Sequence, residues 1–433
     1  MRSLGYVGRF LAIFAVGAFA LLRYGVGRLG TLLERNRERR RTAVSHLQGR
    51  ILRGALSTLG ATFIKLGQVM STRPDLFEPG LIEELSQLQD RLPAFGRARA
   101  QIEAGLERPI DQDFAELDDA PVAAASVAQV HRGRLKDGTE VAVKVLRPDV
   151  REKSERDGRI LLALARLAMK LHPHARHANL AGHLEHFVDG VLAQTDLRIE
   201  AKNYRRFREN FERVDHITFP EVYDDLSGET VMTMDFVRGK KVDALEAGEH
   251  PETAARLRRA FLKMLFEDGF LHADLHPGNL LVQADGRVAI FDVGLSKQLD
   301  DALLEQYIDF NKCLVMGTGP DFVKHLRTYH SYAEDSVDWE NLEDDVNGFL
   351  AQFRGKPASE IEFGALIERV FAVGRQHGIR PVPDMTLIMV GLVTAEGIGK
   401  QLDPHSDSFG EVASYLMPIL IQRNMLPAGM PPA

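Results

Sequence analysis

Residues 272–279 read HADLHPGN, and residues 292–294, at the end of a short apolar run, read DVG. Asp274 precedes Asn279 by five positions, and Asp292 follows Asn279 by thirteen. An aspartate that orients an attacking oxygen, followed by an asparagine and an aspartate that hold Mg²⁺ against phosphates, suits phosphoryl transfer. We therefore predict that Asp274 is catalytic and that Asn279 and Asp292 bind a metal ion. The alternative is a polar loop and a turn that only cap structure.

A lysine stands inside a second apolar run, residues 140–146, which reads EVAVKVL. Lys144 is costly to bury in a strand unless its ammonium group is paired. We predict that Lys144 is a catalytic residue that contacts nucleotide phosphates. Its predicted carboxylate partner at the cofactor site is Glu200, in the helical stretch that follows. Two alternatives stay open. Lys144 on an edge strand would discourage unwanted pairing, and Glu200 on a solvated face would pair with nearby basic residues.

The order of elements around these motifs predicts an α+β, bilobal protein-kinase-like fold with an N-terminal helical extension. Two β-rich runs flank an Asp137-Gly138 turn and predict a hairpin. Strands at 280–283 and 288–291 around a second Asp-Gly turn predict another, and a helix is predicted to begin near Asp301. We expect Lys144 of the first lobe to meet Asp292 of the second in a ligand-binding cleft. The predicted divisions are an apolar helix at 1–30, a helical extension at 31–115, a first lobe at 116–237 and a second lobe at 238–433.

Composition excludes several classes of protein. The chain has 433 residues, 45% hydrophobic and 27% charged, with a formal net charge of −7, so we expect no nucleic-acid binding. A single cysteine, Cys313, excludes internal disulfides and thiolate-cluster zinc sites and favours a reducing compartment. Five histidines lie close together without a frame of carboxylates, so metal binding there is the weaker interpretation. They are His172, His174, His177, His183 and His186.

The N-terminus contains an uncharged apolar run, residues 10–22, between Arg9 and Arg23. It is short for a membrane span of ~20 residues. Five arginines between positions 35 and 41 favour the cytoplasmic side, and they contact lipid headgroups or form a solvated face. We favour a helix that contacts the membrane, peripherally or as an anchor, over a helix docked on its own protein, and both over a signal peptide.

From about residue 45 to about residue 410, the chain resembles the UbiB/AarF family of atypical protein-kinase-like proteins, also called ABC-one or aarF-domain-containing kinases. Residues 65–68, KLGQ, are similar to the Lys-x-Gly-Gln motif of that family, and residues 123–131, AAASVAQVH, are similar to its alanine-rich loop. Taken alone, Lys65 and Gln68 are a polar pair on one helix face. The resemblance implies that both point at the nucleotide, beneath an alanine-rich loop over the phosphates. The loop residues are Ala123, Ala124, Ala125 and Ser126.

The resemblance also implies ATP and Mg²⁺ as cofactors, ATPase or unorthodox kinase activity, and a link to ubiquinone and isoprenoid-lipid metabolism. No Ala-Pro-Glu sequence or long activation segment follows Gly294. We therefore expect ATP hydrolysis or transfer to a small or lipid-like acceptor, such as a quinone precursor, rather than to a protein. The alternatives are an aminoglycoside- or choline-kinase-like enzyme and a nucleotide-binding scaffold or chaperone for a lipid-modifying complex. ATP, ADP and a second copy of the chain are the other expected partners.

Three positions depart from the family pattern. Gln194 replaces the first acid of a Glu-x-Asp motif, which weakens the expected docking of the extension, while Asp196 is kept. Val293 replaces the phenylalanine of Asp-Phe-Gly, and valine is still able to pack apolarly. Many relatives end in two membrane-spanning helices, whereas residues 415–421 and the proline-rich tail after them are too short and too broken to span.

Overall fold

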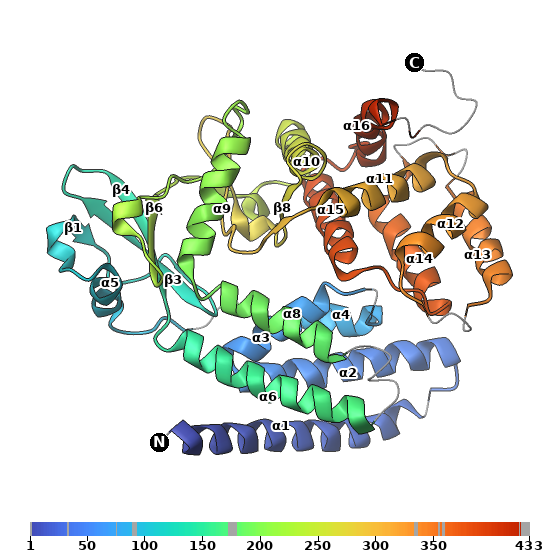
Figure 1. The fold of residues 1–433 in the computed structure, drawn as a ribbon, viewed down its shortest axis with the longest axis horizontal. Coiled ribbons are helices and arrows are strands. Elements are labelled where there is room, and N and C mark those ends of the chain that lie inside the picture. Colours follow the sequence, from blue (N-terminus) through green and yellow to red (C-terminus); the bar gives the residue numbers. More distant parts are fainter. Residues whose placement is uncertain are drawn as a thin grey trace. The chain divides into compact units, whose positions relative to one another are not determined.

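The computed structural model describes residues 2–32, 34–74, 76–88, 93–171, 180–332, 337–353, 356, 360–423 and 425. The chain forms two compact units. Unit 1 comprises Met1–Arg206 and Pro220–Phe236, and unit 2 comprises Phe207–Phe219 and Val237–Ala433. Helices and strands are mixed in both, and a helical extension precedes the first sheet (Figure 1). The predicted α+β class and the N-terminal extension are confirmed.

The described part of unit 1 begins with four helices of the extension: α1 (Arg2–Thr31), α2 (Arg37–Leu59), α3 (Ala61–Ser71) and α4 (Pro79–Leu85). Asn36 caps α2, because its side chain accepts hydrogen bonds from the backbone N–H groups of Glu38 and Arg39. Gly60, with φ of +92°, then allows the sharp turn from α2 into α3. A common core joins these helices to α6 (Val150–Leu171). Its buried residues are Ile13, Leu56, Phe63, Ile64, Leu85, Leu88 and Ile160.

The N-terminal helix α1 occupies the segment predicted as an apolar helix at 1–30 and extends beyond the apolar run within it. The apolar run at residues 10–22 is only part of α1, and Tyr6–Thr31, 26 residues with a mean hydropathy of 1.8, is long and apolar enough to cross a membrane. The sequence left open whether residues 10–22 span a bilayer, and a peripheral helix and a membrane anchor both stay predictions. Arg23 and Arg28 interrupt the apolar run without ending the helix, because arginine is a strong helix former.

The sheet of unit 1 has the strand order β1-β3-β4-β6, with β2 also paired to β3. Its strands are antiparallel: β1 (Phe114–Leu117), β2 (Ala123–Ala124), β3 (Ala128–Leu135), β4 (Glu140–Leu146) and β6 (Val231–Asp235). The predicted hairpin is confirmed as β3–β4, with Gly138 at φ of +92° in its turn. Val141, Val143 and Val145 face a core that includes Ile102 of α5 (Ala98–Leu106). Side chains alternate along a strand, so Lys144 lies on the other face.

Unit 1 is completed by α8 (Leu180–Ala193) and by most of α9 (Leu197–Asn210), of which Leu197–Arg206 belong to unit 1. Leu197 N–H donates to the carbonyl of Glu229 at 2.9 Å, which fixes the start of α9 beside the segment leading into β6. This start is where Glu200 lies, in the first turn of the helix.

Unit 2 contains two small sheets. β8 (Phe270–His272) pairs with β11 (Ser296–Gln298), and a four-stranded sheet has the order β5-β10-β9-β7. These four strands are β5 (Ile217–Thr218), β7 (Lys240–Lys241), β9 (Leu280–Val282) and β10 (Val288–Ile290). The predicted hairpin at residues 280–291 is confirmed as β9–β10.

Seven helices form the rest of the described part of unit 2. They are α10 (Pro251–Phe266), α11 (Asp301–Met316), α12 (Gly319–Tyr329), α13 (Trp339–Ala351), α14 (Phe363–Gln376), α15 (Pro383–Leu402) and α16 (Ser408–Gln422). α10 packs on α15 and on β8, so the strand that leads into Asp274 rests on the helical part of the unit.

Candidate active site

Lys144 and Glu200 form an ion pair inside unit 1. The Lys144 Nζ lies 2.8 Å from Oε1 and 2.7 Å from Oε2 of Glu200, and the side chains are 13% and 6% exposed. β4 is flanked by β3 on one side and β6 on the other, so Lys144 is not on an edge strand. The predicted pairing is confirmed, and the edge-strand and solvated-face alternatives are wrong for these two residues. Their role at a nucleotide stays a prediction.

The alanine-rich loop is a tight hairpin between β2 and β3. Ala125 N–H donates to the carbonyl of Ala128 at 2.8 Å, so Ser126 and Val127 form the turn. Arg147, directly after β4, holds this turn twice: its Nε donates to the carbonyl of Ala125 and its backbone N–H to that of Val127, both at 2.8 Å. The sequence analysis did not identify Arg147. Its place directly after the strand that carries Lys144 could have indicated a role near the loop.

This hairpin contains no described residue with positive φ. Alanine avoids the left-handed conformations that glycine permits, so the alanine-rich sequence matches the backbone that it adopts. We therefore expect this loop to be stiffer than a glycine-rich one.

The Lys-x-Gly-Gln residues lie on α3. Lys65 and Gln68 are both partly buried. The Gln68 Nε2 donates to the carbonyl of Leu88 at 3.3 Å, whereas its buried Oε1 has no hydrogen-bond partner among the residues that the structure describes. A ligand N–H or O–H group would satisfy that acceptor. The glycine of the motif has a packing role, since a Cβ on Gly67 would lie 2.2 Å from Leu88 Cδ1 and 2.7 Å from Leu56 Cδ1.

In unit 2, Asp274 and Asn279 lie in one loop after β8. Asn279 is buried, and its Nδ2 donates to the backbone carbonyl of Asp274 at 3.2 Å. The carbonyl of Asn279 accepts the N–H of Phe291 at 2.9 Å. This loop is thereby tied to the residue that directly precedes Asp292.

His272 provides a second connection between the same two segments. Its side chain is fully buried, its Nε2 donates to the carbonyl of Phe291 at 3.0 Å, and its Nδ1 accepts the N–H of Asp274 at 3.2 Å. These partners require the neutral ring with the proton on Nε2. Burial lowers the pKa of His272 and maintains that neutral form. His272 is thus a positioning residue that sequence reasoning did not identify.

Asp292 has φ of +53°, in the left-handed region, where aspartate is tolerated better than most side chains. Val293 after it is fully buried, so valine packs apolarly in place of phenylalanine as expected. Ser296 Oγ donates to the carbonyl of Val293 at 2.7 Å and fixes the far side of the turn. The turn is held on both sides, which favours one orientation for Asp292.

The chemistry of these groups fits a magnesium ion. Mg²⁺ prefers a few carboxylate and carbonyl oxygens together with water and phosphate oxygens. The amide nitrogen of Asn279 donates to the carbonyl of Asp274. This hydrogen bond fixes the orientation of the amide group, whose Oδ1 is the atom that a cation would use. Asp292 and Lys144 belong to different units, so their predicted meeting stays a prediction.

Asp196, the acid that remains from the Glu-x-Asp pattern, is held by Arg198. Its carboxylate accepts hydrogen bonds from Arg198 N at 3.1 Å, Nε at 2.9 Å and Nη2 at 2.7 Å. The hydrogen bond from the Arg198 side chain is the main reason that the pKa of Asp196 is lowered. Asp196 therefore stays ionised at the start of α9, where a negative charge stabilises the helix.

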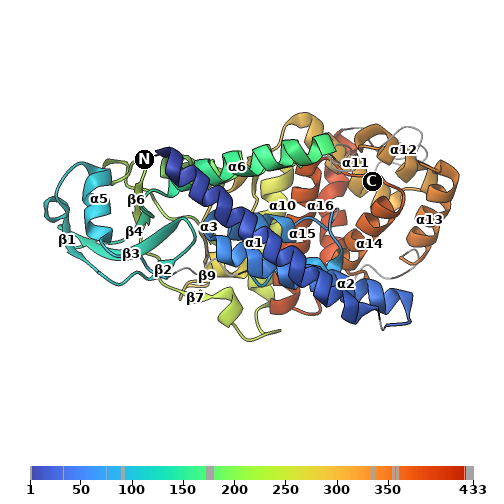
Figure 2. The ribbon, with the colours of Figure 1, turned by 90° about the horizontal axis from the view of Figure 1, so that it is seen from below.

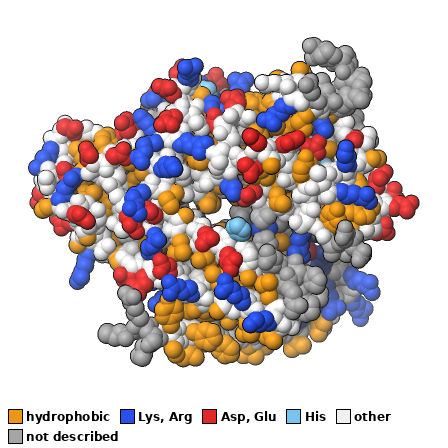
Figure 3. Space-filling view, in the orientation of Figure 1, with side chains coloured by type: hydrophobic (Ala, Val, Ile, Leu, Met, Phe, Trp, Pro, Cys, Tyr) orange, Lys and Arg blue, Asp and Glu red, His pale blue; other side chains and the backbone are white. Residues whose placement is uncertain are grey.

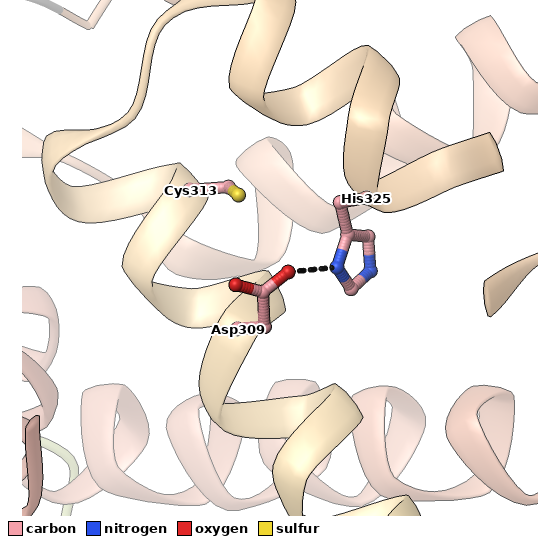
Figure 4. Close-up of side chains that lie close together, drawn as sticks. All are labelled: Asp309, Cys313 and His325. Carbon is pink, nitrogen blue, oxygen red and sulfur yellow. Dashed lines mark hydrogen bonds and ion pairs between the residues drawn. The ribbon is translucent and has the colours of Figure 1, made fainter. Parts of the chain in front are cut away.

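Of the five clustered histidines, His172, His174 and His177 lie outside the described residues. A different polar cluster joins α11 to α12: Asp309 accepts a hydrogen bond from His325 Nδ1 at 2.9 Å, and Cys313 lies one turn along the same helix (Figure 4). Burial opposes the charge on Asp309, but hydrogen bonds from His325 and Lys312 outweigh it and lower its pKa to about 2.

The polar groups of that cluster are largely used within the protein. Lys312 Nζ lies 2.7 Å from Asp309 Oδ1, and Cys313 Sγ donates to the carbonyl of Asp321 at 3.7 Å. Within the described part of the chain, the buried His325 Nε2 has no hydrogen-bond partner, although a metal-bound histidine needs an acceptor for its second N–H. We therefore interpret the cluster as stabilising the packing of α11 on α12.

Comparison with known proteins gives the family. The ABC1 atypical kinase-like domain matches residues 87–318, and the UbiB helical domain matches residues 346–407. The protein named "Probable protein kinase UbiB" from Aliivibrio fischeri is 34% identical over 379 residues, and the one from Aeromonas salmonicida is 32% identical over 380. Each alignment covers 85% of this chain and 70% of the relative. This chain belongs to the UbiB family of ABC1 atypical kinase-like proteins.

The predicted family is thus confirmed, and the chain is an atypical enzyme of the kinase or ATPase type. A solved structure supports the fold: the Rv3197–erythromycin complex from Mycobacterium tuberculosis superposes with a TM-score of 0.52 at 21% identity, covering 78% of this chain and 88% of that one. Use of ATP follows from membership of the UbiB family.

Proposed function

We propose that this UbiB-family chain is a Mg²⁺-dependent ATPase or phosphotransferase that acts on a small or lipid-like acceptor, in support of ubiquinone or isoprenoid-lipid metabolism. The buried Lys144–Glu200 ion pair is the observation that carries the proposal. A lysine fixed in the middle of a sheet by a helix carboxylate is the arrangement that kinases use to bind nucleotide phosphates. The UbiB name of the relatives is the support for the ubiquinone link.

Each unit is proposed to supply its own groups. In unit 1, Lys144 binds phosphate oxygens and Glu200 keeps its ammonium group directed. Lys65 and Gln68 of α3 contact the nucleotide, with the open acceptor on Gln68 Oε1 available for a ligand donor. The turn braced by Arg147 covers the phosphates through backbone N–H groups. Its residues are Ala123, Ala124, Ala125 and Ser126.

In unit 2, Asp274 accepts a hydrogen bond from the attacking hydroxyl or water and takes its proton. As the new P–O bond forms, the bond between the γ-phosphorus and the bridging oxygen breaks, and ADP leaves with that oxygen. Asn279 and Asp292 hold Mg²⁺, which neutralises charge on the phosphate oxygens when it is bound. His272 keeps the segments of Asp274 and Asp292 in register through its two hydrogen bonds. All the groups with a proposed role in unit 2 therefore lie in β8 and the loop after it or at the end of β10.

A short connection favours a small acceptor over a protein. After Gly294 the chain forms β11 at Ser296–Gln298 and begins α11 at Asp301, with Asp300 as its cap. Protein kinases use a longer segment here to bind a protein substrate. The same connection is compatible with simple hydrolysis, in which water is the acceptor.

We also propose that the chain contacts the cytoplasmic face of a membrane through α1, peripherally or as an anchor. The domain boundaries at residues 30, 115 and 237 and a homodimeric state are kept as proposals. A nucleotide-binding scaffold for a lipid-modifying complex is the second candidate, and the neutral Gln194 in place of an acid favours it.

Nucleotide binding and phosphate release, measured on the full chain with and without Mg²⁺, test the proposal. Both are repeated with phospholipid vesicles and with a phenolic quinone precursor. We expect Mg²⁺-dependent binding and slow turnover that an acceptor or membrane increases. Binding without turnover under all conditions would support the scaffold, and no binding at all would exclude both candidates.

A further inference from the structure

α1 is attached to unit 1 near both of its ends. Near its start, Arg9 forms a two-fold ion pair with Asp157 of α6, with Nε–Oδ1 at 2.8 Å and Nη2–Oδ2 at 2.6 Å. The Arg9 Nη2 also donates to the carbonyl of Leu59 at 2.6 Å. Near its end, Gln48 of α2 donates to Tyr24 Oη at 3.3 Å. α1 therefore lies along the extension, across α2 and beside α6 (Figure 2).

The outer face of this docked helix is apolar. Its large exposed side chains that do not line the groove described below are Val7, Leu11, Phe19, Leu22, Val26 and Leu29, each at least 58% exposed. Hydrophobic side chains gather along the edge of the molecule where α1 runs (Figure 3). A helix that keeps one face on its own protein and turns an apolar face outward suits the plane of a membrane surface better than a crossing of it.

A groove of about 610 Å³ lies between α1 and α2, with α4 and α6 contributing to its walls. Its volume is within the range of roughly 300–1,000 Å³ that small-molecule pockets have. The walls are hydrocarbon over most of the length, with Phe10, Phe14, Leu21, Ile51, Leu81 and Leu164 among them. From Phe10 to Tyr24 the groove follows roughly 21 Å of helix, more than the ~15 Å that one leaflet of a bilayer core occupies.

The groove is polar at one end. Tyr24 and Gln48 carry the polar side-chain groups among the described residues that line it, and they bond to each other. Beside them a second hollow, of about 470 Å³, shares Ile51 with the groove and is lined by Arg23 and Arg50. A molecule that fits both hollows has an apolar tail and an anionic head.

Arg50 is only partly neutralised, because among the described residues it has one long ion pair. Its Nε lies 3.8 Å from Glu84 Oε1, and the same carboxylate also pairs with Arg53, whose Nη2 lies 3.4 Å from Glu84 Oε2. One carboxylate thus serves two guanidinium groups. Four of the five arginines from Arg35 to Arg41 are exposed at the junction of α1 and α2, which adds positive charge at the polar end of the groove.

We propose that the groove between α1 and α2 holds one hydrocarbon chain of an anionic bilayer phospholipid, whose phosphate lies at Arg23 and Arg50. The inference builds on the proposed membrane contact of α1 and is independent of the proposed ATP chemistry. The groove makes α1 a lipid-binding helix with a defined stoichiometry of one lipid per chain. The test must distinguish lipid binding from dimerisation, in which a second copy of the chain covers the same face of α1.

Gly17 provides a matched pair of variants. It lines the groove, and a Cβ at this position meets nothing within 4 Å, so Gly17→Leu fills the groove without disturbing the backbone. Gly25→Leu is the control, because Gly25 lies on the same helix, is equally open, and lies outside the residues that line the two hollows. Both substitutions add the same apolar area and the same helix propensity.

The test titrates the full chain with phosphatidylglycerol that carries an environment-sensitive fluorophore on one chain, below its aggregation concentration, and counts bound lipid by native mass spectrometry. We expect one lipid per wild-type chain, an affinity loss of about tenfold or more for Gly17→Leu, and no change for Gly25→Leu. The double variant Arg23→Gln/Arg50→Gln should bind phosphatidylglycerol no better than phosphatidylcholine.

Equal binding by wild type and Gly17→Leu, or many lipids per chain, would overturn the proposal. Dimerisation of wild type that Gly17→Leu abolishes, without lipid binding, would assign the face to a second copy instead. Flotation with vesicles of phosphatidylcholine, with and without phosphatidylglycerol, reports the membrane contact separately, and phosphate release reports the ATP chemistry.

Discussion

The ammonium group of Lys144 lies within 2.8 Å of both carboxylate oxygens of Glu200, and both side chains are nearly buried. Lys144 comes from the middle of a sheet, and Glu200 comes from the first turn of α9. The position of the Lys144 ammonium group is therefore fixed by two separate elements, β4 and α9. Breaking such a buried pair from one side is more costly than the pair itself is stabilising.

Glu200→Gln should therefore weaken both the fold and the reaction. We expect the free energy of unfolding to fall by about 3 kcal/mol, and nucleotide affinity and turnover to fall by about tenfold or more. Chemical denaturation and phosphate release measure the two effects. Glu229→Gln is the control, because Glu229 pairs with Arg198 and Arg151 at the exposed surface, where ion pairs contribute little. Unchanged nucleotide affinity in Glu200→Gln would contradict the assigned role of the pair.

Asp292→Asn should abolish Mg²⁺-dependent turnover. The amide keeps the shape of the side chain but removes the charge, and a bound metal contributes several kcal/mol of transition-state stabilisation, so we expect a loss of about 100-fold or more. Asp285→Asn, in the exposed turn between β9 and β10, should have no effect. Phosphate release as a function of Mg²⁺ concentration distinguishes them. Wild-type activity in Asp292→Asn would rule out the metal assignment.

His272→Leu should lower the turnover number with little change in nucleotide affinity. The leucine leaves the carbonyl of Phe291 and the N–H of Asp274 without the bonds that His272 makes, at a cost of about 1–3 kcal/mol for each buried group. The two aspartate segments then lose their common support. His276→Asn, an exposed position in the same loop, should behave like wild type. If nucleotide affinity and turnover fell equally in His272→Leu, His272 would act by contacting the nucleotide and not by positioning the two aspartates.

The burial of His272 also predicts a pH dependence. Its pKa is lowered in the folded protein, so below the ordinary value of about 6.5 the unfolded chain binds a proton that the folded chain does not. The stability that neutral His272 contributes is complete above that pH and decreases as the pH falls, by up to about 1.4 kcal/mol per pH unit. The fluorescence of Trp339, the single tryptophan, follows unfolding of unit 2. His272→Leu should show the shallower decrease between pH 7 and 5, and equal slopes would contradict this account.

Gly67→Ala should destabilise the extension although alanine is the better helix former. The added Cβ would lie 2.2 Å from Leu88 Cδ1 and 2.7 Å from Leu56 Cδ1, and overpacking of this kind costs about 1–3 kcal/mol. Leu88→Ala creates space, so the double variant should recover part of the loss relative to the two single variants. A double-mutant cycle from thermal unfolding measures this coupling. If the two substitutions changed the stability additively, the side chain of Leu88 would move away from the added Cβ without loss of stability.

Local signals predicted much of the fold. The turn residues between β3 and β4, and those between β9 and β10, identified both hairpins, because turn type limits which residues fit. The pairing of Lys144 with Glu200 was predictable for a related reason: a lysine in an apolar strand requires a partner, and the following helix offered a carboxylate. The start of α11 at Asp301 was also predicted near the observed position.

Other features depend on residues far apart in the chain. Arg9 and Asp157 are separated by 148 positions, and no periodicity connects them. The pairing of β8 with β11 joins strands of three residues each, which are too short to give a pattern. The tautomer of His272 follows from which backbone groups surround its ring, and these are known only from the fold.

The connection from Gly294 to Asp301 has a consequence for control. Many kinases are switched on when a phosphate added to a flexible loop in this place draws that loop into order. Here three of the six intervening residues are already hydrogen-bonded into β11, and Asp300 is fixed as a helix cap. Few residues of this connection are therefore left to change between an ordered and a disordered state. Activity in this protein would accordingly be set by what the molecule encounters, a ligand or a surface, rather than by a covalent mark on itself.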